Sequence, residues 1–205
     1  MNVLSDELAR LGTATVYEAA GREGLIDLDL QRIVPGSRAA GPARPVLCGP
    51  GDNLMVHAAI AHAHPGDVLV LTMPDPFPVA LIGDLLATQA LERGVAALLI
   101  DGAVRDAEDL VELGLPVWAR WIRVRGAAKD TPGTLDAPVT VGGQRIAAGD
   151  IVVLDGDGAA VVAADRVDAV LEAALDREGR ERIKREKLQA GALSYDLDHL
   201  RERVE

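Results

Sequence analysis

Three charged residues stand near the starts of two predicted helices. Asp84 follows Gly83, and Arg105 and Asp106 are adjacent further along the chain. The forked N–H donors of an arginine can hold a carboxylate, and aspartates can bind a hard divalent cation. Free backbone N–H groups at a helix start also favour an anion. The pattern therefore predicts a carboxylate and cation site, with helix capping and a surface Arg–Asp pair as the alternative.

Two apolar segments lead to these residues. Residues 68–71 and 95–100 contain only apolar side chains, which is typical of strands buried on both faces of a parallel sheet. The first segment leads through a proline-rich loop to a helix over about 84–93. The second ends at a turn, Asp101-Gly102, before a helix over about 106–113. Because parallel strands end at one edge of their sheet, we expect the charged residues to converge there.

Other segments predict helices at both termini and a strand-rich region after Ile122. Thr13 is expected to cap the second helix, and residues 155–158 are expected to form a tight hairpin turn. We expect one α/β domain over 1–205, with a C-terminal helical extension from about 165 to 205. These further elements are helices over 4–11, 14–20, 53–63 and 165–187, and strands over 45–48, 115–119, 151–154 and 159–162.

The composition excludes several classes of protein. The 205 residues carry a net charge of −11 and 2% aromatic residues, which argues against binding nucleic acid through phosphates or stacked bases. Because no run of about 18 apolar residues and no signal-peptide core is present, we expect a cytoplasmic protein with no membrane partner. Cys48 is the single cysteine, so a disulfide framework and a cysteine-rich zinc site are excluded.

The charged residues belong to an ordered set of short motifs that covers nearly the whole chain. This set resembles the RraA-like family, and within it the class II, metal-dependent 4-hydroxy-4-methyl-2-oxoglutarate/4-carboxy-4-hydroxy-2-oxoadipate (HMG/CHA) aldolases. The resemblance implies a layered β/β/α "swivelling" domain with terminal helices, assembled as a homotrimer or homohexamer. The motifs are Thr13-Ala14-Thr15-Val16-Tyr17-Glu18-Ala19, Pro50-Gly51-Asp52-Asn53-Leu54-Met55, Pro65-Gly66-Asp67-Val68-Leu69-Val70, Gly83-Asp84-Leu85-Leu86-Ala87-Thr88, Arg93-Gly94-Val95-Ala96, Ile100-Asp101-Gly102-Ala103-Val104-Arg105-Asp106, Gly114-Leu115-Pro116-Val117-Trp118-Ala119-Arg120 and Gly149-Asp150-Ile151-Val152.

The resemblance implies roles for the three charged residues. Asp106 would bind Mg²⁺ or Mn²⁺, partly through ordered waters. Arg105 would contact the carbonyl side of a 2-oxo acid and stabilise an enolate. Asp84 would help to hold a water that acts in proton transfer. Together these roles make Arg105 and Asp84 the expected catalytic residues and Asp106 the expected metal ligand.

The resemblance also implies the surroundings of the substrate. The backbone N–H groups of Leu85 and Leu86, in the segment that begins at Gly83, would bind the carboxylate of pyruvate. Asn53 would line the pocket. Glu18 would reach the metal-bound waters of a neighbouring subunit, so the active site would be shared between subunits.

The implied activity is cleavage of a 4-hydroxy-2-oxo diacid to pyruvate and a second 2-oxo acid. Oxaloacetate decarboxylation is a related expectation, because it passes through the same enolate. Preorganised positive charge from a metal ion and an arginine suits that enolate. The three lysines, Lys129, Lys184 and Lys187, lie in polar segments, which disfavours an aldolase that forms a Schiff base.

Some positions depart from the aldolase pattern. Ala192 stands where the aldolases usually carry a glutamate, and Tyr17 stands where they usually carry a histidine. The alternative is a non-catalytic RraA-like regulator that binds a ribonuclease or another protein. The family's ribonuclease regulators lack the metal-binding aspartate after the arginine. This chain carries Asp106, which favours the metal-dependent branch.

Two further groups of side chains have competing interpretations. The arginines after the strand over 115–119 could attract a polycarboxylate tail of the substrate or form a solvated strand edge. These are Arg120, Arg123 and Arg125. The histidines of one predicted helix lack the spacing of a zinc site, so we expect them to be solvated or at an interface. These are His57, His62 and His64.

Overall fold

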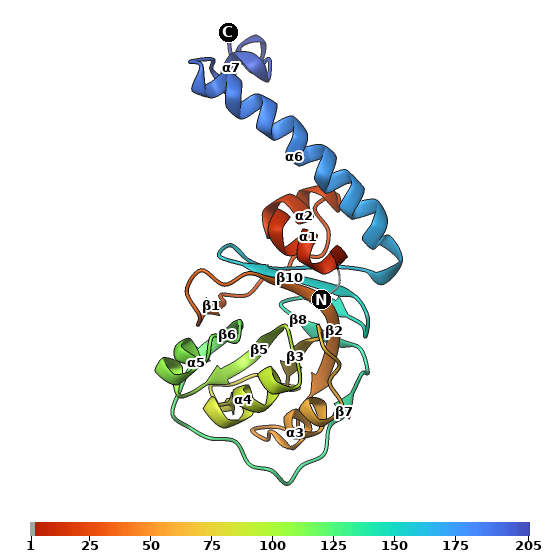
Figure 1. Cartoon of the computed structure of the whole chain (residues 1–205), viewed down its shortest axis with the longest axis vertical. Helices are drawn as coiled ribbons and strands as arrows, with labels where there is room; N and C mark the ends of the chain where they lie inside the picture. The colour runs from red at the N-terminus through yellow and green to blue at the C-terminus, as the bar shows by residue number, and fades with distance from the viewer. Residues whose placement is uncertain (1–2) are drawn as a thin grey trace.

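The computed structural model describes residues 3–205, and a mixed sheet lies at their centre (Figure 1). Its main strands follow the order β1-β6-β5-β3-β2-β10-β11, and the neighbours among β6, β5, β3 and β2 are parallel. The strands are β1 Gln31–Arg32, β2 Ala39–Leu47, β3 Val68–Thr72, β4 Ala80–Ile82, β5 Ala97–Val104, β6 Val117–Ile122, β7 Thr134–Leu135, β10 Ile151–Asp155 and β11 Gly158–Val162. A separate hairpin joins β8 Val139–Val141 to β9 Gln144–Ile146. The predicted parallel sheet is therefore confirmed as part of a larger mixed sheet.

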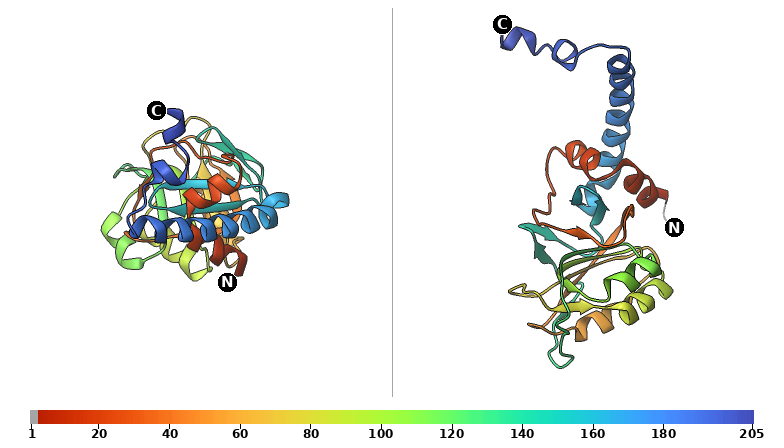
Figure 2. Two further views of the ribbon diagram at one scale, coloured as in Figure 1. Left: turned by 90° about the horizontal axis from the view of Figure 1, so that it is seen from above. Right: turned by 90° about the vertical axis from the view of Figure 1, so that its left-hand side faces the viewer.

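Helices cover this sheet in two places (Figures 1 and 2). The helices α3 Leu54–Ala61, α4 Asp84–Glu92 and α5 Ala107–Leu113 lie along one face of the parallel strands. The helices α1 Val3–Leu11, α2 Thr13–Ala19 and α6 Val167–Gln189 gather at the other end, where α6 projects from the body towards α7 Ser194–Leu197. Short 3₁₀ turns lie at Ala164–Arg166 and Arg201–Arg203. No helix within residues 3–205 is long and apolar enough to cross a membrane.

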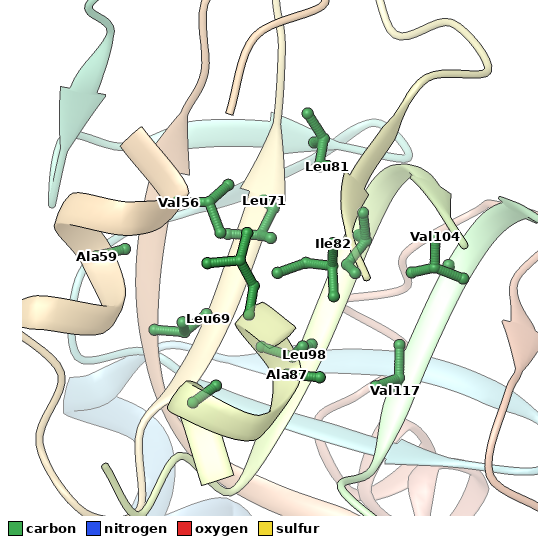
Figure 3. Packing of buried hydrophobic residues seen from close by; sticks show 14 of the residues in the cluster. Val56, Ala59, Leu69, Leu71, Leu81, Ile82, Ala87, Leu98, Val104 and Val117 are labelled. Carbon is green, nitrogen blue, oxygen red and sulfur yellow. The ribbon is translucent and has the colours of Figure 1, made fainter. Parts of the chain in front are cut away.

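The parallel strands are buried on both faces, as their uniform apolar composition predicted. Every residue of β3 and β5 is buried. Because side chains alternate across a strand, Leu69 and Leu98 pack under α3 and α4 (Figure 3), whereas Val70 and Leu99 pack in the cluster on the opposite face. Truncating such a leucine to alanine lowers the free energy of unfolding by about 2–5 kcal/mol. This packing therefore holds the strands, and so their ends, in place.

The terminal helices form a third apolar cluster against β10, β11 and β2. Leu8 of α1, Val16 of α2 and Val170 of α6 contribute to it. The buried residues of α6 all lie in its first eight positions, ending at Ala174. Beyond them, the C-terminal turns stay close to α6 through ion pairs such as Lys184–Asp198. The predicted helices at both ends are therefore confirmed.

Two local predictions were wrong. We expected a turn at Asp101-Gly102, but β5 continues to Val104, because its last residues pair with β4 on one side and β6 on the other. Asp101 is buried there and receives a hydrogen bond from Arg120 at 3.0 Å. Strand β4, Ala80–Ile82, was missed: it lies between the expected proline-rich loop, which ends at Pro78, and the helix start that we expected near Asp84.

Thr13 does not cap the second helix in the expected way. It is the first residue of α2, and Gly12 occupies the cap position with φ of 82°. The Thr13 backbone N–H and hydroxyl instead donate to the two carboxylate oxygens of Asp155, at 2.9 and 2.5 Å. A carboxylate from the predicted hairpin turn thus satisfies the helix start.

Asp52 ties the start of α3 to the loop over residues 126–131. Its Oδ1 accepts the Leu54 N–H at 2.8 Å, and its Oδ2 accepts the N–H groups of Asp130 and Thr131 at 2.7 and 2.9 Å. Burial acts to raise the pKa of Asp52, but these three donors outweigh it and hold the pKa below its usual range. The ionised carboxylate therefore stabilises this junction.

The Asp52→Asn substitution should lower stability in a pH-dependent way. A depressed pKa in the folded state contributes stability above the unfolded value, about 4, and loses it as pH falls through the folded value. We expect the difference in melting temperature from the wild type to be largest near neutral pH and to shrink in acid. Asp157→Asn, at an exposed turn residue, is the matched control. A difference that is constant from pH 7 to pH 3 would contradict the role of Asp52.

Candidate functional site

The pairing of β4 with β5 brings the predicted charged residues together. Ile82 pairs with Val104, and the N–H of Arg105 donates to the Ile82 carbonyl at 3.1 Å. The chain leaves β4 into Gly83 and Asp84 and leaves β5 into Arg105 and Asp106. The two segments therefore emerge side by side at one edge of the sheet. This confirms the expected convergence, although the strand that produces it was not predicted.

Asp106 links the two segments through one carboxylate oxygen. Its Oδ2 accepts the backbone N–H of Asp84 at 3.3 Å and lies 3.3 Å from Nε of Arg105. Its Oδ1 has no partner among residues 3–205. The backbone of Asp106 is left-handed, with φ of 57°, a strained conformation that aspartate tolerates better than most residues. One oxygen thus holds the segments together, and the other is free to bind a ligand.

Gly83 permits this close approach. A Cβ atom at this position would lie 2.5 Å from Oδ2 of Asp106 and 3.0 Å from Nε of Arg105. The first distance is shorter than a Cβ contact allows and the second is tight, so a side chain at this position would displace the Asp106 carboxylate.

The Asp84 carboxylate has no hydrogen bond or ion pair within the described chain, and it does not cap its helix. Asp106 likewise makes no side-chain cap for α5. The capping alternative therefore fails for both aspartates. The Arg105–Asp106 ion pair is present, but it is partly exposed, and such pairs contribute about 1 kcal/mol or less to stability. A contribution to folding stability therefore does not explain why these three charged residues lie together.

A cavity of about 180 Å³ opens beside these charges. Gly83, Asp84, Leu85 and Leu86 line it from the start of α4, and Arg105 lines it from the end of β5. Asn53 reaches it from the start of α3. Asp106 lies at the edge of a neighbouring open hollow that shares Arg105. The structure therefore brings together the residues to which the sequence assigned substrate and metal roles, apart from Glu18.

Glu18 lies elsewhere in this chain. Its carboxylate is 3.2 Å from Nε of Arg22 and 3.8 Å from Arg177, across the contact between α2 and α6. Its suggested reach to a neighbouring subunit stays a prediction.

Arg120, within β6, and Arg123, just after it, lie in different environments. Arg120 pairs with Asp101 and stacks on the ring of Trp121 at 4.3 Å, so its charge is already used. Arg123 lines the open hollow next to Asp106. Trp118 is buried in the core and donates its indole N–H to the Asp155 carbonyl, so it does not shape the cavity.

Three polar side chains line the cavity that sequence reasoning did not assign to it: His57, Gln89 and Lys129. His57 lies one helical turn after Asn53, so its position on the same face was a usable signal. Lys129 lies in an exposed, glycine-bounded loop whose path no local pattern reveals. Lys129 therefore lies in an exposed polar segment, as expected, and that segment also borders the cavity.

The donor set suits Mg²⁺ or Mn²⁺ better than a cation that needs a full protein cage. No cluster of three or more His, Cys, Asp or Glu side chains suited to a metal occurs among residues 3–205. Mg²⁺ is commonly held by one or two carboxylates and keeps several waters. Asp106, through its free Oδ1, and the unpaired Asp84 fit that pattern.

Comparison with known proteins identifies one relative named as an aldolase and others described as ribonuclease or RNA-processing inhibitors. Residues 13–161 match the family model RraA-like (Aldolase/RraA). A protein of Halalkalibacterium halodurans, provisionally named 4-hydroxy-4-methyl-2-oxoglutarate aldolase, is 32% identical over 174 residues, covering 82% of this chain and 83% of that protein.

Two solved structures share the fold. Streptomyces coelicolor RraAS2, described as an unusual member of the RNase ES inhibitor RraA protein family, superposes with a TM-score of 0.82 at 28% identity, covering 91% of this chain and 98% of that one. The RNA-processing inhibitor RraA from Thermus thermophilis gives 0.67 at 28% identity, covering 73% and 91%. The layered α/β architecture with terminal helices is thus the RraA-like fold.

Gly83→Ala should disturb the site without unfolding the protein. The added methyl group would displace the Asp106 carboxylate, and we expect Mn²⁺ affinity to fall about tenfold or more. Free Mn²⁺ measured by electron paramagnetic resonance gives the affinity. Gly179→Ala, at a helical position with open space, is the matched control. Wild-type Mn²⁺ affinity in Gly83→Ala would show that Asp106 does not hold the metal.

Proposed function

Because the chain belongs to the RraA-like family, we propose that it is a divalent-metal-dependent aldolase. It cleaves 4-hydroxy-2-oxo diacids, such as 4-hydroxy-4-methyl-2-oxoglutarate, to pyruvate and a second 2-oxo acid. One observation carries the proposal: two carboxylate groups with free oxygens, on Asp84 and Asp106, flank Arg105 beside a cavity. Carboxylate oxygens that are left free beside an arginine can bind a ligand or a metal, which suits catalysis.

The substrate is held first by its C1 carboxylate. The backbone N–H groups of Leu85 and Leu86 belong to the first turn of α4, where they have no partner within the helix. The helix dipole adds positive potential at the same point. The 2-oxo group then faces Arg105, which lines the same cavity.

Cleavage breaks the C3–C4 bond, and the bonding electrons pass to C3 and the 2-oxo oxygen as an enolate. The guanidinium of Arg105, which is paired with Asp106, stabilises the negative charge that develops on that oxygen. A divalent cation at Asp106 would act as a Lewis acid towards the same charge. The negative charge of the enolate is thus stabilised by Arg105, and a cation held by Asp106 would add to that stabilisation.

Two proton movements balance the reaction. The 4-hydroxyl group loses its proton as C4 becomes a carbonyl, and C3 of the enolate gains one to give pyruvate. Asp84 has a carboxylate with no protein partner, so it can orient a water that accepts and returns the proton. Oxaloacetate would form the same enolate by losing CO₂, which makes it a convenient substrate.

Lys129 does not support a Schiff-base mechanism. A lysine that forms a Schiff base is commonly enclosed in an apolar pocket or placed beside another cation, whereas Lys129 is exposed in its loop. We therefore assign Lys129 an electrostatic role.

A second candidate function is regulation of a ribonuclease by binding. It is favoured by the two similar structures described as ribonuclease or RNA-processing inhibitors. The acidic surface, with a net charge of −11, offers a means of binding a basic partner. Under either function we propose a homotrimer or homohexamer in the cytoplasm.

Purified protein with Mg²⁺ should release pyruvate from oxaloacetate and from 4-hydroxy-4-methyl-2-oxoglutarate. Arg105→Ala and Asp106→Ala should each lower kcat/KM by about 100- to 1,000-fold, because each removes preorganised charge stabilisation. Coupled pyruvate detection measures the rate. Arg145→Ala, at an exposed residue of β9, should behave as the wild type.

Controls separate the alternatives. EDTA should abolish turnover, and borohydride added with substrate should not inactivate the enzyme. Borohydride inactivation that is lost in Lys129→Gln would overturn the metal mechanism in favour of a Schiff base. No metal-dependent turnover, together with capture of ribonuclease E by the purified protein, would support the regulator instead.

A further inference from the structure

The cavity has polar side chains that the proposed reaction does not use. Asn53 and His57 reach it from α3, and Lys129 reaches it from the loop over residues 126–131. Arg105 and the start of α4 account for the C1 carboxylate and the 2-oxo group. The remaining side chains therefore face the half of the substrate that departs.

The amide of Asn53 is fixed in one orientation. Its Nδ2 donates to the carbonyl oxygen of Leu81 at 3.0 Å, and a carbonyl can only accept. The Asn53 Oδ1 is buried without a partner, on a residue that is 7% exposed. A buried acceptor without a donor is costly. The donor must come from the cavity, either the hydroxyl-bearing end of a substrate or a water beside it.

His57 presents a second unpaired atom. Its Nε2 is buried and has no hydrogen-bond partner in the structure. The backbone N–H of His57 donates to the Asn53 carbonyl at 3.4 Å, which places the two side chains one helical turn apart. An imidazole N–H at this position can donate to an anion.

Lys129 is held next to these side chains by its loop. The Asn53 N–H donates to the Ala128 carbonyl at 2.9 Å on one side, and Asp52 accepts the N–H groups of Asp130 and Thr131 on the other. The ammonium group forms no ion pair within the described chain, although its charge helps to lower the pKa of Asp52. Its positive charge is therefore available to a ligand.

We propose that Lys129 and His57 form a subsite for the second carboxylate of the substrate. The inference rests on the proposed function, and it names a specificity that the aldol chemistry does not require. Arg105 and the α4 N–H groups take one anionic end, while Lys129 and His57 take the other. A cavity of about 180 Å³ between two positively charged groups suits a short diacid. Lys129 and His57 thus select diacids over monoacids with the same reacting carbons.

Two matched substrates isolate this selection. In 4-hydroxy-4-methyl-2-oxopentanoate a methyl group replaces the second carboxylate of 4-hydroxy-4-methyl-2-oxoglutarate, and the bond that breaks is the same. The wild type should prefer the diacid in kcat/KM. Lys129→Gln and His57→Gln should each reduce this preference about 10- to 100-fold, mainly through a higher KM for the diacid. Lys129→Arg should recover much of the preference, and Lys187→Gln, on the exposed part of α6, should retain it.

Binding of unreactive acids tests the subsite without turnover. Calorimetry with Mg²⁺ should show that 2-oxoglutarate binds more tightly than 2-oxopentanoate, and that Lys129→Gln weakens only the diacid. If neither aldol is cleaved but the diacid still binds through Lys129, the proposed function fails and the subsite stands. Equal preference for diacid over monoacid in the wild type and both glutamine variants would overturn the subsite.

Discussion

The Asp106 carboxylate holds the two halves of the site together. Its Oδ2 contacts the backbone of Asp84 and the guanidinium of Arg105, each at 3.3 Å. The contact exists because β4 pairs with β5 and because Gly83 leaves no side chain in the way. Every catalytic role proposed here depends on that junction, since it aims the arginine and leaves the other oxygen of Asp106 free. The buried strands of the sheet supply the rigidity, and the strained φ of Asp106 is borne by that support.

The other side of the cavity depends on a second carboxylate. Asp52 binds three backbone N–H groups and so joins the start of α3 to the loop that carries Lys129. The two carboxylates act in different ways. Asp52 is buried and fully used within the protein, whereas Asp106 keeps one oxygen for a ligand.

Local sequence patterns predicted the parallel strands and the convergence of Asp84 with Arg105 and Asp106. Uniform apolar runs and strand-end geometry carry that information. These local patterns did not predict the segments whose structure depends on contacts with distant parts of the chain. Strand β4 is three residues long and directly follows a proline-rich loop, and it forms because it can pair with the edge of β5. Lys129 reaches the cavity only because a distant carboxylate fixes its loop, which no spacing of residues 126–131 could indicate. Sequence reasoning thus placed Asp84, Arg105 and Asn53 at the cavity and missed His57 and Lys129.

The central claim is that Arg105 and its neighbouring aspartates stabilise a pyruvate enolate with the help of a divalent metal. Exchange of the methyl protons of pyruvate for deuterium tests this most directly, because the enolate forms without any cleavage step. Proton NMR in D₂O should show exchange catalysed by the wild type with Mg²⁺, and its loss with EDTA or in Arg105→Ala. Exchange at the uncatalysed rate in the presence of Mg²⁺, or exchange that is indifferent to EDTA, would contradict the account.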